Sequence, residues 1–119
     1  MTRSRATAKQ AGSLWEKKVA EYLDSRLSVD VERRARNGAK DRGDINGVKA
    51  FGERVVIECK DVAKTNISGW LTEAEVEREN DSAAIGVVAA KRRGKGDPAD
   101  GVVMMTLATF AWLLERSEK

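Results

Sequence analysis

The stretch that decides the fold reads GDINGVKAFGERVVIECK, from Gly43 to Lys60. It contains two apolar-rich runs joined through Phe51-Gly52-Glu53, a pattern typical of a β-hairpin. We expect residues 51–53 to form a three-residue loop, so that Ala50 pairs with Arg54. A two-residue turn would instead shift the register by one residue and move every side chain of one strand to the other face.

Charged residues stand out in this hairpin because the segments around them are apolar. The three-residue loop pairs Asp44 with Lys60 and Asn46 with Glu58, and facing residues share one face of a sheet. Asp44, Glu58 and Lys60 should therefore project from the same face. Burying charge is costly unless the charge is paired or holds a metal ion.

Two converging carboxylates suit a hard divalent cation such as Mg²⁺, which binds one or two carboxylates together with water and substrate phosphates. Lys60, two residues after Glu58, can position or deprotonate a water molecule, or stabilise phosphate charge. The arrangement predicts phosphodiester cleavage. The alternative is a surface salt bridge on a solvated sheet face.

The composition of the chain limits the possible functions. The 119 residues suffice for one domain, which we expect to span residues 12–119, and the net charge of +3 permits nucleic-acid binding. No histidine is present, which excludes Cys/His zinc sites, Ser-His-Asp triads and a histidine base. The single cysteine, Cys59, allows no internal disulfide and indicates an intracellular protein. We expect no membrane segment and no small-molecule cofactor.

Hydrophobic periodicity predicts an α/β fold in which a five-stranded mixed sheet is flanked by helices on both faces. The three tryptophans, Trp15, Trp70 and Trp112, should belong to the core. The expected order is α-β-β-β-α-β-β-α: a helix over 14–27, a strand over 28–35, the hairpin, a helix ending near 81, strands over 84–91 and 102–107, and a final helix with Leu107, Phe110, Ala111, Leu113 and Leu114 on its apolar side.

Glu16 in the first expected helix has two interpretations. Ser13-Leu14-Trp15-Glu16 matches the capping box, in which a glutamate bonds back to the amide of the cap residue. Alternatively, Glu16 points over the sheet and adds a third carboxylate to the site. The two roles need not exclude each other.

Basic residues gather in three segments, each of which is either solvated or a phosphate contact. Residues 1–11 form a flexible basic N-terminal arm. The second segment leads into the hairpin, and the third follows the strand over 84–91. The candidate DNA-binding residues of these two loops are Arg33, Arg34, Arg36, Lys40, Arg42, Lys91, Arg92, Arg93 and Lys95.

Glu16, Gly43-Asp44 and Glu58-Cys59-Lys60, in this order, resemble the PD-(D/E)xK nuclease superfamily. The small size and the helix-first order are most similar to Holliday-junction resolvases of the archaeal type and their bacteriophage counterparts. Gly43 occupies the proline position of the motif, and Asp41 is a nearby competitor of Asp44. The resemblance implies a restriction-endonuclease-like core.

The resemblance also implies roles for individual residues. Asp44 and Glu58 would be metal ligands, Lys60 would position or activate the attacking water, and Glu16 would join the acidic site. Mg²⁺ would be the cofactor, with Mn²⁺ able to replace it. A polar residue of the second helix would also contribute, which leaves Glu73, Glu75 and Glu77 as alternatives. Family members of this kind are homodimers that cut two strands symmetrically.

The leading hypothesis is a Mg²⁺-dependent endonuclease that resolves four-way DNA junctions, in the host cytoplasm if a phage encodes it. A second hypothesis keeps the chemistry but changes the substrate to duplex, nicked, flapped or single-stranded DNA. A third is a non-catalytic DNA-binding module that retains the basic loops.

Overall fold

The computed structural model describes residues 4–34 and 43–119, and within these residues the chain is α/β. Three α-helices accompany one four-stranded mixed sheet and one two-stranded sheet. Along the chain the elements are α1 (Arg5–Arg26), β1 (Glu32–Arg33), β2 (Ile45–Asn46), β3 (Lys49–Ala50), β4 (Glu53–Lys60), α2 (Ile67–Asn80), β5 (Ile85–Ala90), the short 3-10 helix η1 (Pro98–Asp100), β6 (Val102–Met104) and α3 (Leu107–Ser117).

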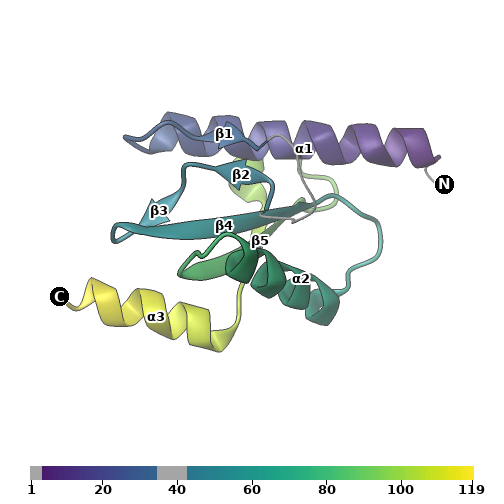
Figure 1. The fold of residues 1–119 in the computed structure, drawn as a ribbon. Coiled ribbons are helices and arrows are strands. Elements are labelled where there is room, and N and C mark those ends of the chain that lie inside the picture. Colours follow the sequence, from purple (N-terminus) through teal and green to yellow (C-terminus); the bar gives the residue numbers. More distant parts are fainter. Residues whose placement is uncertain (1–3, 35–42) are drawn as a thin grey trace.

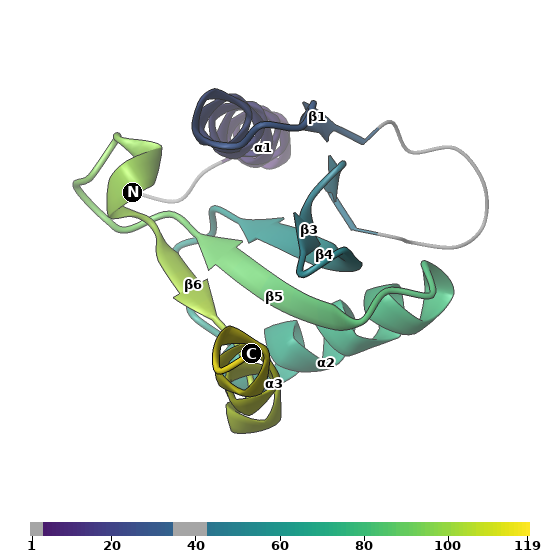
Figure 2. The same ribbon diagram turned by 90° about the vertical axis from the view of Figure 1, so that its left-hand side faces the viewer.

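The larger sheet has the strand order β3-β4-β5-β6 (Figure 2). Strands β4 and β5 run parallel, with Lys60 opposite Ala90, and β6 is antiparallel to β5. Strand β5 is therefore internal, as its nearly continuous apolar sequence predicted. The expected five-stranded sheet is not formed by the described residues, because β1 and β2 pair only with each other.

The helices lie on both faces of the larger sheet (Figure 1). Helix α1 covers one face, where Trp15 and Val19 pack with Ile57, Cys59 and Val87. The indole Nε1 of Trp15 donates a hydrogen bond to the backbone oxygen of Ala89 at 3.0 Å and ties α1 to β5. Helix α2 covers the other face with a second core cluster, formed by Trp70, Ala74, Val88 and Ala90.

Helix α1 begins nine residues earlier than the expected start at residue 14. Ser4, not Ser13, is its N-cap, and the Ser4 hydroxyl accepts a hydrogen bond from the amide of Thr7 at 3.1 Å. Residues 5–11, expected to form a flexible arm, are helical because alanine, lysine and glutamine there favour a helix. Glu16 lies in the middle of the helix, so the capping-box interpretation of Ser13 and Glu16 is wrong.

The predicted three-residue hairpin loop is also wrong. Ala50 pairs with Glu53, and Phe51 and Gly52 form a two-residue turn. Both turn residues have positive φ, 54° and 80°, which is typical of the tight turns that match strand twist. A phenylalanine in this conformation is uncommon. The sequence therefore gave no signal for the shorter turn.

A bend at Gly47, between β2 and β3, explains why the new hairpin register does not separate Asp44 from Glu58 and Lys60. Gly47 has a φ of 101°, and a Cβ atom there would overlap the backbone oxygen of Asp30. The chain bends at this point, so that β3 pairs with β4 whereas β2 turns to β1. Asp44 thus approaches β4 independently of the turn, and its amide donates to the oxygen of Ile57 at 2.9 Å.

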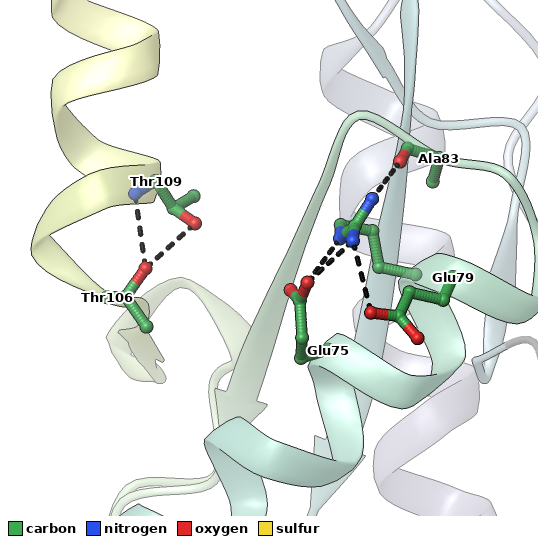
Figure 3. Close-up of polar contacts among 6 residues, drawn as sticks. Glu75, Glu79, Ala83, Thr106 and Thr109 are labelled. Atoms are coloured by element: carbon green, nitrogen blue, oxygen red, sulfur yellow. Dashed lines mark hydrogen bonds and ion pairs between the residues drawn. The ribbon is translucent and has the colours of Figure 1, made fainter.

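The N-cap of helix α3 is Thr106, whose hydroxyl accepts a hydrogen bond from the amide of Thr109 at 3.1 Å (Figure 3). None of its residues is buried, although its sequence predicted a core-facing side. Trp112, expected in the core, is half-buried under the guanidinium of Arg116, 3.8 Å from the ring centre. Among the described residues, no helix is long and apolar enough to cross a membrane.

Candidate active site

Alternation along β4 divides the predicted Glu58-Cys59-Lys60 motif between the two faces of the sheet. Cys59 belongs to the core cluster under α1. Glu58 and Lys60 project toward α2, where Lys60 forms an ion pair with Glu73 of that helix. Asp44 and Glu58 are only 2% and 4% exposed, which is unusual for carboxylates.

The backbone around Asp44 holds its carboxylate against β4. The amide of Cys59 donates a hydrogen bond to Oδ2 of Asp44 at 2.8 Å. Gly43, immediately before it, has a φ of 92°, and a Cβ there would lie 2.9 Å from Cγ1 of Val56. Proline cannot adopt a positive φ. Glycine at position 43 is therefore required by the local backbone.

Glu58 lies at the centre of the acidic cluster, which we define as Asp44, Glu58 and Glu77. Burial raises the pKa of Glu58 far above its usual range, and hydrogen bonds with the carboxyl groups of Glu77 and Asp44 raise this pKa further. Its Oε2 atom is buried and has no hydrogen-bond partner among the described residues. This environment disfavours the ionised carboxylate unless a positive charge is added.

Glu77 is the member of the cluster that the sequence did not single out. The sequence left Glu73, Glu75 and Glu77 as alternatives, and the structure separates them. Glu77 is 2% exposed and contacts Glu58. Glu75 instead accepts hydrogen bonds from Arg78, as Figure 3 shows. The signal was the helical spacing, because Glu77 continues the buried stripe of Trp70 and Ala74 at i+7 and i+3.

Lys60 lies half-buried beside the acidic cluster. Its Nζ atom is 2.8 Å from Oε2 of Glu73. Burial acts to lower the pKa of Lys60, but the hydrogen bond with Glu73 and the charges of Glu58, Glu73 and Glu77 outweigh it, and the net pKa is raised. Lys60 is therefore a cation at neutral pH and is poorly suited to accept a proton in this state.

Glu16 faces the same region from α1 without touching Glu58 in any described interaction. Its Oε1 atom is 3.0 Å from Nε of Arg33, and its side chain is mostly buried. Burial raises the pKa of the Cys59 thiol, and the charges of Asp44, Glu16, Glu58 and Glu77 raise it further. Glu16 thus shares the negative field around Cys59 but stands apart from the cluster.

The predicted DNA-binding residues fall into three groups. Arg33 pairs with Glu16, and Arg34 is 3.1 Å from Oδ1 of the buried Asp81, so both arginines are engaged within the fold. Arg92, Arg93 and Lys95 are exposed in the loop after β5, which begins with the half-buried Lys91. Arg36, Lys40 and Arg42, as well as the competing Asp41, lie outside the described residues.

A metal site would have to use few protein ligands. Within residues 4–34 and 43–119, no group of three or more histidine, cysteine, aspartate or glutamate side chains has an arrangement that could hold a metal ion. Asp44 and Glu58 nevertheless offer only oxygen donors, and the buried Oε2 of Glu58 faces no donor among these residues. Two carboxylates completed by water and phosphate oxygens are a common environment for Mg²⁺.

Comparison with known proteins adds no relative: no family model, no curated protein and no solved structure matches the chain.

Proposed function

We propose that this protein is a Mg²⁺-dependent, structure-selective DNA endonuclease with a restriction-endonuclease-like core, which resolves four-way junctions by paired cuts. One observation supports this most strongly. Buried Asp44 and Glu58 are held together beside the cationic Lys60 at the end of β4, next to the exposed basic loop that follows β5. A protein that only bound DNA would gain nothing from carboxylates placed near phosphates.

The donor chemistry of the acidic cluster fits Mg²⁺, and Mn²⁺ would replace it because both prefer oxygen ligands. Asp44 and Glu58 would hold the ion, and the raised pKa of Glu58 indicates that the cluster needs added positive charge. A bound ion would supply phosphate charge neutralisation and a more acidic water molecule. Glu77, in contact with Glu58, would position that ligand from α2.

Lys60 would act as a fixed positive charge. Because its pKa is raised, the ammonium group can orient a water molecule or stabilise the negative phosphate of the transition state, rather than remove a proton. Glu73 restrains its Nζ atom at 2.8 Å. Glu16 would contribute its charge from α1, with its carboxylate oriented by Arg33.

The proposed protein partner is a second copy of the chain. It would bind through the exposed stripe of α3, which we define as Leu107, Phe110 and Leu114. These residues recur at i, i+3 and i+7 and are 82%, 48% and 49% exposed. The stripe contains no charged residue, so two copies can meet across a two-fold axis without like-charge repulsion. A stable interface buries roughly 800 Å² on each partner, and the stripe would form its apolar centre.

The test is cleavage of a labelled four-way junction and of a matched linear duplex, each with Mg²⁺ and with EDTA. Asp44→Asn should lower the cleavage rate at least about 100-fold while retaining the fold, because the amide oxygen can still accept the Cys59 hydrogen bond. Glu53→Gln is the matched control, since Glu53 is an exposed acid at the other end of β4 and should cut at the wild-type rate.

Each outcome leads to a different conclusion. Paired, symmetric, metal-dependent cuts in the junction alone would establish a resolvase. Equal cutting of both substrates would keep the nuclease and discard the junction. Tight binding of DNA with no cutting would overturn the proposed activity and favour the binding module.

A further inference from the structure

A second site lies next to the acidic cluster, at the carboxyl ends of the parallel strands β4 and β5. A cavity of about 260 Å³ opens there between Lys60 at the end of β4 and the loop that follows β5. The amide of Lys91 donates to the backbone oxygen of Lys60 at 2.9 Å, so the start of this loop is fixed against β4. Crevices at the carboxyl ends of strands are common ligand sites in α/β proteins.

The charge of the cavity is of one sign. Its basic lining consists of Lys60, Lys91, Arg92 and Arg93, and no described acidic residue lines it. Arg92 and Arg93 are exposed and form no ion pair with any described residue, so their guanidinium groups are available to a ligand. Arginine binds phosphate oxygens in a bidentate manner, which gives the cavity a preference for a phosphate group.

Apart from Thr65, the rest of the lining is apolar. Trp70 and Val62 contribute to it, and Val62 is 53% exposed, which places an unburied hydrophobic side chain at the cavity. A phosphate alone needs no such surface. A ligand that combines an anionic group with a flat, weakly polar body would use both parts, and a nucleotide is such a ligand.

Lys60 connects this cavity to the acidic cluster, because the same side chain lines the cavity and interacts with the charges of Glu58 and Glu77. A phosphate above Asp44 and Glu58 would thus be adjacent to a group held in the cavity. We propose that the cavity binds one nucleotide of the DNA strand next to the scissile phosphate, with its base outside the helical stack. The proposal rests on the proposed function and deepens it, since it makes an unpaired nucleotide the feature that is recognised.

The cavity can be tested without cleavage, by amide NMR titration in EDTA with dTMP, thymidine and inorganic phosphate. We expect dTMP to shift the amides of Thr65, Arg92 and Arg93 and to bind at least about tenfold more tightly than either fragment, because only dTMP uses both surfaces. Arg92→Ala and Arg93→Ala should each weaken dTMP binding about tenfold. Lys95→Ala, in the same loop but outside the cavity lining, should change it less than twofold.

A further variant separates the two halves of the cavity. Val62→Asn should weaken dTMP several-fold and leave inorganic phosphate unchanged. Equal affinity for phosphate and dTMP would overturn the nucleotide assignment, as would shifts that map elsewhere. These outcomes are independent of nuclease activity, so the cavity can fail while the proposed function stands, and the reverse.

A second arm tests whether the nucleotide belongs to a DNA strand. A four-way junction carries 2-aminopurine beside the mapped cut, and its fluorescence is followed in EDTA. Binding to the wild-type protein should brighten the probe at least twofold as the base leaves the stack, and Arg92→Ala/Arg93→Ala should reduce that gain even when the junction is saturated. A junction that binds without any brightening would overturn the proposal, and the cavity would then bind only free nucleotides.

Discussion

Helices α2 and α3 both depart from the usual rule that apolar side chains are buried and charged side chains are exposed, and they do so in opposite ways. Helix α2 buries a carboxyl group, that of Glu77, beside two other acids. Helix α3 buries nothing and exposes Leu107, Phe110 and Leu114. A buried acid is costly without a compensating charge, and an exposed apolar stripe is costly without an apolar partner. In the proposed function, a bound ion would compensate the first departure and a second copy of the chain the second.

The largest expected effect concerns α3. Phe110→Glu should weaken self-association by about 2 kcal/mol or more, because it introduces like charges at the proposed dimer interface. Sedimentation velocity over a range of protein concentrations measures this. Leu14→Glu is the matched control, since Leu14 of α1 is similarly exposed, 54% against 48% for Phe110, and should leave association unchanged. A wild-type protein that remains monomeric at all concentrations would refute the dimer and remove the reason given for the exposed stripe.

The next effect concerns α2. Glu77→Gln should reduce Mg²⁺-dependent cleavage about 10- to 100-fold, because in the proposed mechanism Glu77 orients Glu58 rather than reacting with the substrate. Glu73→Gln, one turn earlier on the same helix, removes the ion pair with the Lys60 ammonium and should reduce the cleavage rate less than about tenfold. Single-turnover cleavage at saturating Mg²⁺ compares the two variants. If Glu73→Gln were the more damaging change, the restraint of Lys60 would matter more than the third carboxyl group.

The smallest effect is on stability. The pKa of Glu58 is raised above its ordinary value of 4.5, so the protonated form is the one that the fold favours. Its stabilising contribution is complete below about pH 4.5 and is lost as the pH rises toward the folded-state pKa. In EDTA, the free energy of unfolding should fall by about 1.4 kcal/mol between pH 7 and pH 8 from this residue, because the folded protein holds one proton more than the unfolded chain in this range.

Thermal melts with and without Mg²⁺ measure this dependence. Glu58→Gln should flatten it and should melt roughly 4 °C above the wild type at pH 8 in EDTA. Mg²⁺ should stabilise the wild type more than the variant. An identical pH dependence in both proteins would show that Glu58 titrates normally. The buried acids beside α2 would then give no reason to expect a bound ion.

The sequence predicted the composition of the candidate site better than its geometry. Asp44, Glu58 and Lys60 lie close together, as predicted. The hairpin register from which this prediction was made, however, is wrong. The turn at Phe51-Gly52 requires positive φ at a phenylalanine, which propensity does not indicate. Tertiary contacts at Gly47 then determined the approach of Asp44, and such contacts between distant segments leave no local pattern in the sequence.

The helices show the same limit. Glu77 followed the spacing of the buried stripe on α2, but the sequence did not separate it from Glu73 and Glu75. The apolar periodicity of α3 was real, although periodicity alone cannot tell whether the partner of an apolar face belongs to the same chain. Of the three tryptophans, Trp15 and Trp70 lie in the core as predicted, whereas Trp112 lies on α3 and is half-buried.

The contacts of Arg34 have a consequence for how such a protein can diversify. Its amide donates to the backbone oxygen of Asp44 at 2.8 Å, and its guanidinium reaches both Asp81 and Asn46. The segment from 35 to 42 therefore begins and ends at two points that are already joined. Lengthening a loop closed at its base costs little free energy, since the cost grows only with the logarithm of its length. Residues can thus be inserted there while the carboxylate of Asp44 keeps its place.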